Sequence, residues 1–143
     1  MMGPVDRRVR STRETNVAAP VFVFDAYGTL FDVHAAIARH REAAGRDADR
    51  LSEMWRTKQL EYTWTLTLAG RYLDFWTLTE RALDYALART PSVDRALRPK
   101  LLEAYLALDA FPDARTCLHD LQRRTLRTAI LSNGSPAMLN AAV

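Results

Sequence analysis

The chain has 143 residues and a mass of 16.2 kDa, of which 48% are hydrophobic and 26% charged. That is long enough for one domain with a buried core. The net charge is +3, but Arg7, Arg8, Arg10 and Arg13 lie within the first 20 residues, so the charge is no argument for nucleic-acid binding. No apolar run is long enough for a membrane helix, and the single Cys117 cannot form an internal disulfide. We therefore expect a cytoplasmic protein that binds neither nucleic acid nor membrane.

The first strand is expected directly after a basic tail. Residues 1–20 are interpreted as a disordered extension, because no apolar segment follows the arginines. The apolar run 21–24 is typical of a strand in a parallel sheet that is covered on both faces. Asp25 then falls at the carboxyl end of that strand, where ligands bind in open α/β sheets, and Gly28 forms a turn after it. The other interpretation is that Asp25 only caps the following helix.

Helices fill the middle of the chain. Apolar spacing predicts a helix over 33–44 that Gly45 ends, and a long helix over 50–69 that Gly70 ends. Asp74 is a suitable N-cap for a third helix.

The third helix should stop before Pro91, and further helices are expected after it. A fourth is predicted over 92–108, which Pro99 should kink or split because proline has no amide donor. A fifth begins near Pro112, since proline is tolerated in a first helical turn.

The spacing changes again near the C-terminus. Residues 126–131 are predicted to form a second strand that ends in Ser132-Asn133-Gly134, and Ser135-Pro136 begins another helix. About 100 residues separate the two strand ends, far more than one crossover helix needs. The predicted fold is therefore α/β: a partial, doubly wound parallel sheet (residues 21–32 and 110–143) with a helical cap (residues 33–109) inserted after the first strand.

Three segments resemble a known family. Asp25–Leu30, Met54–Trp64 and Leu131–Pro136 are together similar to type II L-2-haloacid dehalogenases of the haloacid dehalogenase superfamily. The first segment alone marks only the superfamily, whereas the three in this order and spacing are more specific. Chains of that family are longer, and after the last segment they carry further strands, a lysine and a Ser/Asn/Asp cluster. We therefore expect an N-terminal portion without the C-terminal strands, which aggregates or turns over 2-chloropropionate negligibly when expressed alone.

The resemblance implies a reaction without metal or cofactor. Asp25 would displace halide from a short (S)-2-haloalkanoic acid, and water would hydrolyse the aspartyl ester to the (R)-2-hydroxy acid. Phosphatases of this fold have an acid two residues after the nucleophile, to protonate the leaving group and help hold magnesium. Tyr27 occupies that place here, and a halide needs no proton. Tyr27 could also simply pack beneath the inserted helices.

The resemblance assigns the halide to Arg56 and Asn133, because a departing anion is stabilised by a guanidinium and an amide NH₂. Arg56 shares a helical stripe with Leu60, although it could instead form a surface pair with Glu53. Thr29 matches a position that hydrogen-bonds near the nucleophile, and the other interpretation is that it only satisfies local backbone groups.

The remaining matched residues would surround the substrate. Ser132, with the amides of Ala26 and Tyr27, would hold the substrate carboxylate, unless Ser132 is only a helix cap. Tyr27, Leu60 and Phe75 would line a dry pocket that makes the carboxylate a stronger nucleophile. Residues of these types at helical spacing are also ordinary core residues.

Two other functions stay open at this stage. The first is a phosphatase-like hydrolase of the same superfamily. The second is an inactive remnant whose helices form an interaction surface, since Trp55, Trp64 and Trp76 could make an exposed apolar patch that would also allow a homodimer.

Overall fold

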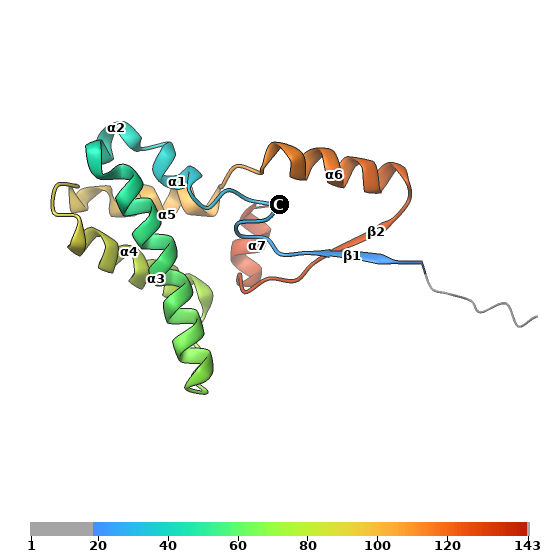
Figure 1. The fold of residues 1–143 in the computed structure, drawn as a ribbon, viewed down its shortest axis with the longest axis horizontal. Coiled ribbons are helices and arrows are strands. Elements are labelled where there is room, and N and C mark those ends of the chain that lie inside the picture. Colours follow the sequence, from blue (N-terminus) through green and yellow to red (C-terminus); the bar gives the residue numbers. More distant parts are fainter. Residues whose placement is uncertain (1–18, 143) are drawn as a thin grey trace, which may run out of the picture.

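The computed structural model describes residues 19–142 (Figure 1). The predicted disordered tail lies outside them except for its last two residues, so it stays a prediction. The helices and strands run in the order β1 Val21–Phe24, α1 Ala35–Ala38, α2 Arg41–Ala44, a 3₁₀ helix Gly45–Asp47, α3 Ala48–Leu68, α4 Phe75–Arg89, a 3₁₀ helix Arg95–Leu97, α5 Arg98–Leu106, α6 Pro112–Arg123, β2 Arg127–Ile130 and α7 Pro136–Ala142.

The helices and strands gather into two regions (Figure 1). We call α1 to α5, residues 35–106, the helical lobe, and we call β1, β2, α6 and α7, residues 21–24 and 112–142, the sheet region. Within the lobe α3 packs along α4, and α1 packs on α5. Helix α7 of the sheet region contacts α5 of the lobe, and its Met138 is buried.

The predicted helix ends are confirmed where a local signal marks them. The Asp74 carboxylate caps α4 by accepting hydrogen bonds from the backbone N–H groups of Trp76 (3.0 Å) and Thr77 (3.3 Å). Gly45 and Gly70 adopt positive φ angles of 65° and 64°. Glycine takes this conformation with little strain, so each of them ends a helix as expected.

The single helix predicted over 33–44 is wrong. The chain instead forms the one-turn helices α1 and α2, with a break at His40, whose φ and ψ are −114° and 21°. On either side of the break, Arg39 pairs with Asp109 at 2.7 Å and Arg41 pairs with Asp49. Four-residue helices are not stable alone, so tertiary contacts and not local periodicity decide this segment.

The predicted split of the helix over 92–108 is confirmed. A 3₁₀ turn, capped by Asp94, leads into α5, and Pro99 lies in the first turn of α5. Proline is tolerated there because the amide of a first-turn residue has no partner inside the helix.

The two strands form a parallel pair, as predicted, with Val21 opposite Arg127 and Phe24 opposite Ile130. The expected burial of both faces is not found among the described residues. Val21 is 45% exposed, Val23 57% and Ile130 40%. A two-stranded ladder has two faces to cover. Helix α6 packs against β2, but it leaves these side chains in contact with solvent.

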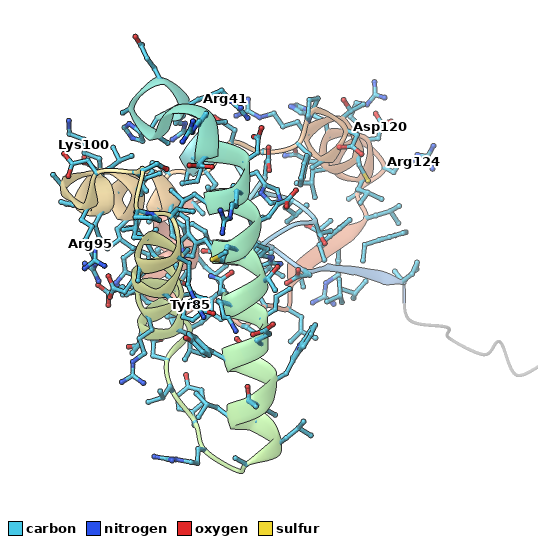
Figure 2. The ribbon with its side chains drawn as sticks, turned by 60° about the vertical axis from the view of Figure 1, so that its left-hand side comes forward. Arg41, Tyr85, Arg95, Lys100, Asp120 and Arg124 are labelled. Carbon is cyan, nitrogen blue, oxygen red and sulfur yellow. The ribbon has the colours of Figure 1, made fainter. Side chains whose placement is uncertain are left out.

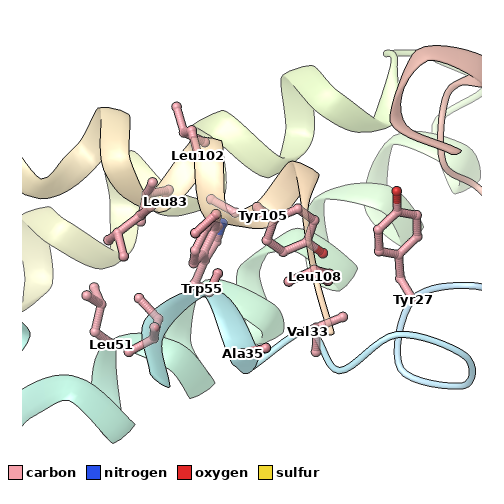
Figure 3. Packing of buried hydrophobic residues seen from close by; sticks show 14 of the residues in the cluster. Tyr27, Val33, Ala35, Leu51, Trp55, Leu83, Leu102, Tyr105 and Leu108 are labelled. Atoms are coloured by element: carbon pink, nitrogen blue, oxygen red, sulfur yellow. The ribbon is translucent and has the colours of Figure 1, made fainter. Parts of the chain in front are cut away.

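The tightest packing lies in the helical lobe (Figure 3). Leu51, Leu83 and Leu101 are fully buried there, and the rings of Trp55 and Tyr105 lie 5.0 Å apart. Charged side chains such as Arg41 and Lys100 project from the outside (Figure 2). No helix within residues 19–142 has the length and apolar character to cross a membrane.

The predicted tryptophan patch is wrong. Trp55 belongs to the core and donates a hydrogen bond through Nε1 to the Thr79 carbonyl at 2.9 Å, and Trp76 is half-buried. Only Trp64 of the three, at 60% exposed, reaches solvent to a large extent. An amphipathic helix presents its indoles to different environments, and the sequence spacing alone did not separate the two faces of α3.

Candidate active site

Asp25 and Ser132 lie at the same end of the two strands. Both strands run in the same direction, and the Leu131 amide donates to the Phe24 carbonyl at 2.9 Å, so the residues after β1 and β2 emerge side by side. The Asp25 side chain is exposed and available to a ligand. The carboxyl end of the sheet is thus built as predicted.

The loop after Asp25 closes on itself through backbone hydrogen bonds. The Ala26 carbonyl accepts from the amides of Leu30 (3.0 Å) and Phe31 (2.9 Å), and the Gly28 amide donates to the Phe31 carbonyl at 2.8 Å. Gly28 has a φ of 96°, a conformation that L side chains rarely adopt. Asp25 is therefore followed by a tight and internally bonded turn.

Arg56 reaches this loop from α3. Its Nη2 donates to the Tyr27 carbonyl at 2.8 Å, and its Nη1 donates to Gln59 Oε1 at 2.8 Å. A methyl group on Gly28 would lie 3.3 Å from Nη2, so glycine leaves room for the guanidinium. Arg56 is thus held at the loop of the proposed nucleophile, and not in the surface pair with Glu53 that the sequence also allowed.

Tyr27 is buried where the loop after Asp25 meets the helical lobe. Its ring stacks on Tyr105 with centroids 5.8 Å apart (Figure 3). The centroid of the Phe75 ring lies 5.9 Å from that of Tyr27. Burial, and then the neighbouring Tyr105, raise the pKa of Tyr27 to about 12. The phenol is therefore neutral at physiological pH and places no negative charge beside an anionic substrate.

The charges of Arg56 and Asp25 both affect the pKa of Tyr105. Burial raises the pKa of its phenol most, the hydrogen bond with Gln59 and the charge of Arg56 lower it, and the charge of Asp25 raises it. The charges of Arg56 and Asp25 thus shift the pKa of this buried phenol in opposite directions.

The Ser132-Asn133-Gly134 segment packs against the Tyr27 ring. A Cβ atom on Gly134 would lie 2.6 Å from Cε2 of Tyr27, so only glycine fits against this ring. The Ser132 hydroxyl accepts from the Gly134 amide at 3.2 Å, while Ser135 accepts from the Met138 amide at 3.3 Å and caps α7. Ser132 is thus not the cap of that helix, and its O–H remains able to donate to a ligand.

A cavity of about 370 Å³ opens between this segment and the helical lobe. Phe75, Ser132 and Asn133 line it, together with Arg71 from the turn that precedes α4. The structure therefore brings three of the predicted site residues into one space. Neither Asp25 nor Arg56 is part of its lining.

Two predicted residues lie further from this space. Thr29 is exposed on the turn, where its amide makes only a long backbone contact of 3.5 Å with the Ala26 carbonyl. Leu60 is half-buried on α3, one turn beyond Arg56. Neither lines the cavity. Across the described part of the chain, no group of three or more His, Cys, Asp or Glu side chains is placed to hold a metal ion.

A buried polar cluster behind Arg56 was not predicted from the sequence. Gln59 is 1% exposed, Thr79 is fully buried and Tyr105 is 3% exposed. The signal for Gln59 was its position: it follows Trp55 by four residues on the buried stripe of α3, and Arg56 by three. Nothing local marks Thr79 and Tyr105, which come from α4 and α5.

Comparisons with known proteins identify the family to which the chain is similar. The sequence model of a family described as haloacid dehalogenase-like hydrolase matches residues 19–143. The (S)-2-haloacid dehalogenase 1 of Pseudomonas sp. (strain CBS-3) is 51% identical over 122 residues, which are 85% of this chain and 54% of that protein.

Solved structures give the same result. A crystal structure of a dehalogenase aligns with a TM-score of 0.81 and 46% identity over 89% of this chain and 56% of that one. The L-2-haloacid dehalogenase from Xanthobacter autotrophicus with chloropropionic acid covalently bound aligns with a TM-score of 0.75 and 42% identity, over 87% of this chain and 50% of the other. The chain thus spans about half the length of the relatives it matches.

Proposed function

The chain belongs to the haloacid dehalogenase-like hydrolases, and we propose that it serves the hydrolytic dehalogenation of short-chain (S)-2-haloalkanoic acids to (R)-2-hydroxyalkanoic acids. One observation carries the proposal: the Arg56 guanidinium is bound to the Tyr27 carbonyl, two residues from the exposed carboxylate of Asp25. The proposed nucleophile thus precedes the loop to which the cation for the leaving halide is bound.

In the first step, an oxygen of Asp25 attacks the halogen-bearing carbon from the face opposite the halogen. The new carbon–oxygen bond forms as the carbon–halogen bond breaks, and the halide leaves with the bonding electrons. Arg56 and Asn133 stabilise the negative charge that develops on it. The product is an aspartyl ester with inverted configuration at the carbon.

In the second step, water attacks the carboxyl carbon of Asp25 and releases the 2-hydroxy acid. The bond that breaks joins the Asp25 carboxyl carbon to the ester oxygen, and the bond from that oxygen to the inverted carbon stays intact. The product therefore keeps its configuration, and the Asp25 carboxylate is restored. One water molecule is consumed, and one halide and one proton are released in the whole reaction.

The substrate carboxylate is assigned to the Ser132 hydroxyl and the amides of Ala26 and Tyr27. The neutral phenol of Tyr27 supports this, because an acid in its place would repel the substrate. Phe75 and Leu60 are proposed as apolar walls, and Thr29 as a hydrogen-bonding group beside the nucleophile.

The wider assignments belong to the same proposal. We take residues 33–109 as a cap and residues 21–32 and 110–143 as the core, which leaves the site at their junction. Reducing conditions in the cytoplasm would suit the exposed free Cys117. The exposed Trp64 and Leu68 of α3 would be available to a second copy in a homodimer.

Alkylation of Asp25 tests the proposal, because it needs only the nucleophile and the leaving-group contacts. Incubation with (S)-2-bromopropionate should release at least one bromide per chain. Mass spectrometry of rapidly quenched protein should find a carboxyethyl group on the peptide that contains Asp25. The (R)-enantiomer and the Asp25→Asn variant are the controls and should give neither result. Bromide release that survives Asp25→Asn would overturn the proposal, and magnesium-dependent hydrolysis of 4-nitrophenyl phosphate would favour a phosphatase.

A further inference from the structure

We infer that Gln59, held in turn by Thr79, fixes the direction in which the Arg56 guanidinium points. Both are then positioning residues of the site, since neither touches the reacting atoms. The inference rests on the proposed function for its catalytic meaning, whereas the fixed guanidinium is a physical property that can be measured without any substrate.

A continuous chain of hydrogen bonds leads away from Arg56 into the helical lobe. Arg56 Nη1 donates to Gln59 Oε1 at 2.8 Å, and Gln59 Nε2 lies 2.6 Å from Thr79 Oγ1. Thr79 Oγ1 lies 2.8 Å from the Phe75 carbonyl oxygen. The chain joins α3 to α4 and ends at Phe75, which lines the cavity beside the site.

Donor and acceptor chemistry permits only one direction along this chain. A guanidinium can only donate, so the carbonyl oxygen of the Gln59 amide has to face Arg56. The backbone carbonyl of Phe75 can only accept, so the Thr79 hydroxyl donates to it and offers a lone pair to Gln59. The Gln59 NH₂ group then has to face Thr79. A flipped amide would set two donors against each other at Arg56.

Burial makes any other arrangement costly. Tyr105 closes the cluster, because its hydroxyl lies 3.0 Å from Gln59 Nε2 and 3.2 Å from Oε1. Gln59, Thr79 and Tyr105 are all at most 3% exposed, so a rotated amide would leave buried polar groups without partners. Within the described residues no buried side-chain nitrogen or oxygen atom lacks a hydrogen-bond partner.

The guanidinium is therefore held at two of its nitrogen atoms. Gln59 holds Nη1 and the Tyr27 carbonyl holds Nη2, which fixes the plane of the group relative to the loop of Asp25. Donors that are already oriented need no rearrangement when negative charge develops on a leaving halide, and this lowers the barrier more than it strengthens substrate binding.

Thr79→Val and Thr79→Ser form the matched test pair. Valine keeps the shape and loses the hydroxyl, whereas serine keeps the hydroxyl. In ¹H–¹⁵N spectra of the substrate-free full chain, wild type and Thr79→Ser should show separate, slowly exchanging signals for the Arg56 guanidinium N–H groups. In Thr79→Val these signals should merge or disappear. Persistence of separate signals in a folded Thr79→Val protein overturns the inference.

The rate of Asp25 alkylation by (S)-2-bromopropionate, followed as the first bromide released per chain, then tests the catalytic meaning. Thr79→Val should lower the maximal rate constant of this step by about tenfold and change the half-saturating concentration of bromopropionate by less than about threefold, because oriented donors act mainly on the transition state. Thr79→Ser should restore most of the rate constant. An equal loss in both variants, or a change confined to the half-saturating concentration, contradicts a positioning role in the reaction.

Tyr105→Phe keeps the test decisive if Thr79→Val does not fold, as judged by circular dichroism. It removes only the hydroxyl that contacts Gln59 and keeps the stacked ring. The same Arg56 guanidinium signals should then merge or disappear. Failure of the proposed function would look different. In that case wild type would release no halide, while the guanidinium signals would still depend on Thr79 and Tyr105.

Discussion

The helical lobe and the sheet region bury their apolar residues to very different degrees. In the lobe Leu51, Leu83 and Leu101 are fully buried, whereas on the strands Val21 and Val23 are 45% and 57% exposed. Hydrophobic stabilisation is roughly proportional to the apolar area removed from water. The lobe therefore supplies most of the stability of the described chain.

The chemistry is divided between the same two regions. Asp25 and Ser132 follow the strands, while Arg56 comes from α3 in the lobe. Two contacts join the regions at the site: the hydrogen bond of 2.8 Å from Arg56 to the Tyr27 carbonyl, and the stacking of the Tyr27 ring on Tyr105 of α5, with centroids 5.8 Å apart. The comparison indicates that the well-packed lobe holds the site in place, although the nucleophile itself belongs to the more exposed region.

The largest expected effect tests this difference in packing directly. Leu83→Ala should lower the free energy of unfolding by about 2–5 kcal/mol, because it leaves a cavity in a fully buried position. Val23→Ala on β1 removes a largely exposed side chain and should cost less than about 1 kcal/mol. Urea unfolding followed by circular dichroism measures both. Equal losses would show that the strands contribute as much as the lobe.

The second effect concerns the junction. The pKa of Tyr27 is raised to about 12 in the folded protein, so above pH 10 the folded state keeps a proton that the unfolded state has lost. Stability from this group is present below about pH 10 and is lost as pH rises toward 12, by an amount on the order of 2 kcal/mol.

Tyr27→Phe should therefore flatten the fall in unfolding free energy between pH 10 and pH 12. Tyr72→Phe is the matched control, because the Tyr72 side chain is 89% exposed and meets similar surroundings before and after unfolding. Parallel pH profiles for wild type and Tyr27→Phe would show that the ring is not buried at the junction.

The smallest effect compares helix caps in the two regions. Asp74→Ala should destabilise the protein by about 1 kcal/mol, because two amides at the start of α4 lose their acceptor. Asp74→Asn keeps an acceptor and should change the free energy of unfolding by only a few tenths of a kcal/mol. Ser135→Ala, which removes a single bond of 3.3 Å at α7, should cost less than Asp74→Ala. Thermal unfolding ranks the three, and the reverse order would contradict the comparison.

The sequence by itself determined the features that have local causes. Asp74 caps α4, Gly45 and Gly70 end helices with positive φ, and Pro99 lies in the first turn of α5, where the helix predicted over 92–108 is split. The end of β1 at Asp25 also followed from an apolar run that stops at a carboxylate. In each case a few neighbouring residues set the backbone conformation, so no distant part of the chain was needed to predict it.

Only the tertiary structure decided the features that join distant segments. The break at His40, the buried face of α3 and the partners of Arg56 depend on α4, α5 and the Asp25 loop. Gln59, Thr79 and Tyr105 are ordinary residues in the sequence and become a directed hydrogen-bond chain only when three helices bury them together. The physical reason is that a buried polar group must find its partner wherever the fold brings one, and sequence distance does not record that.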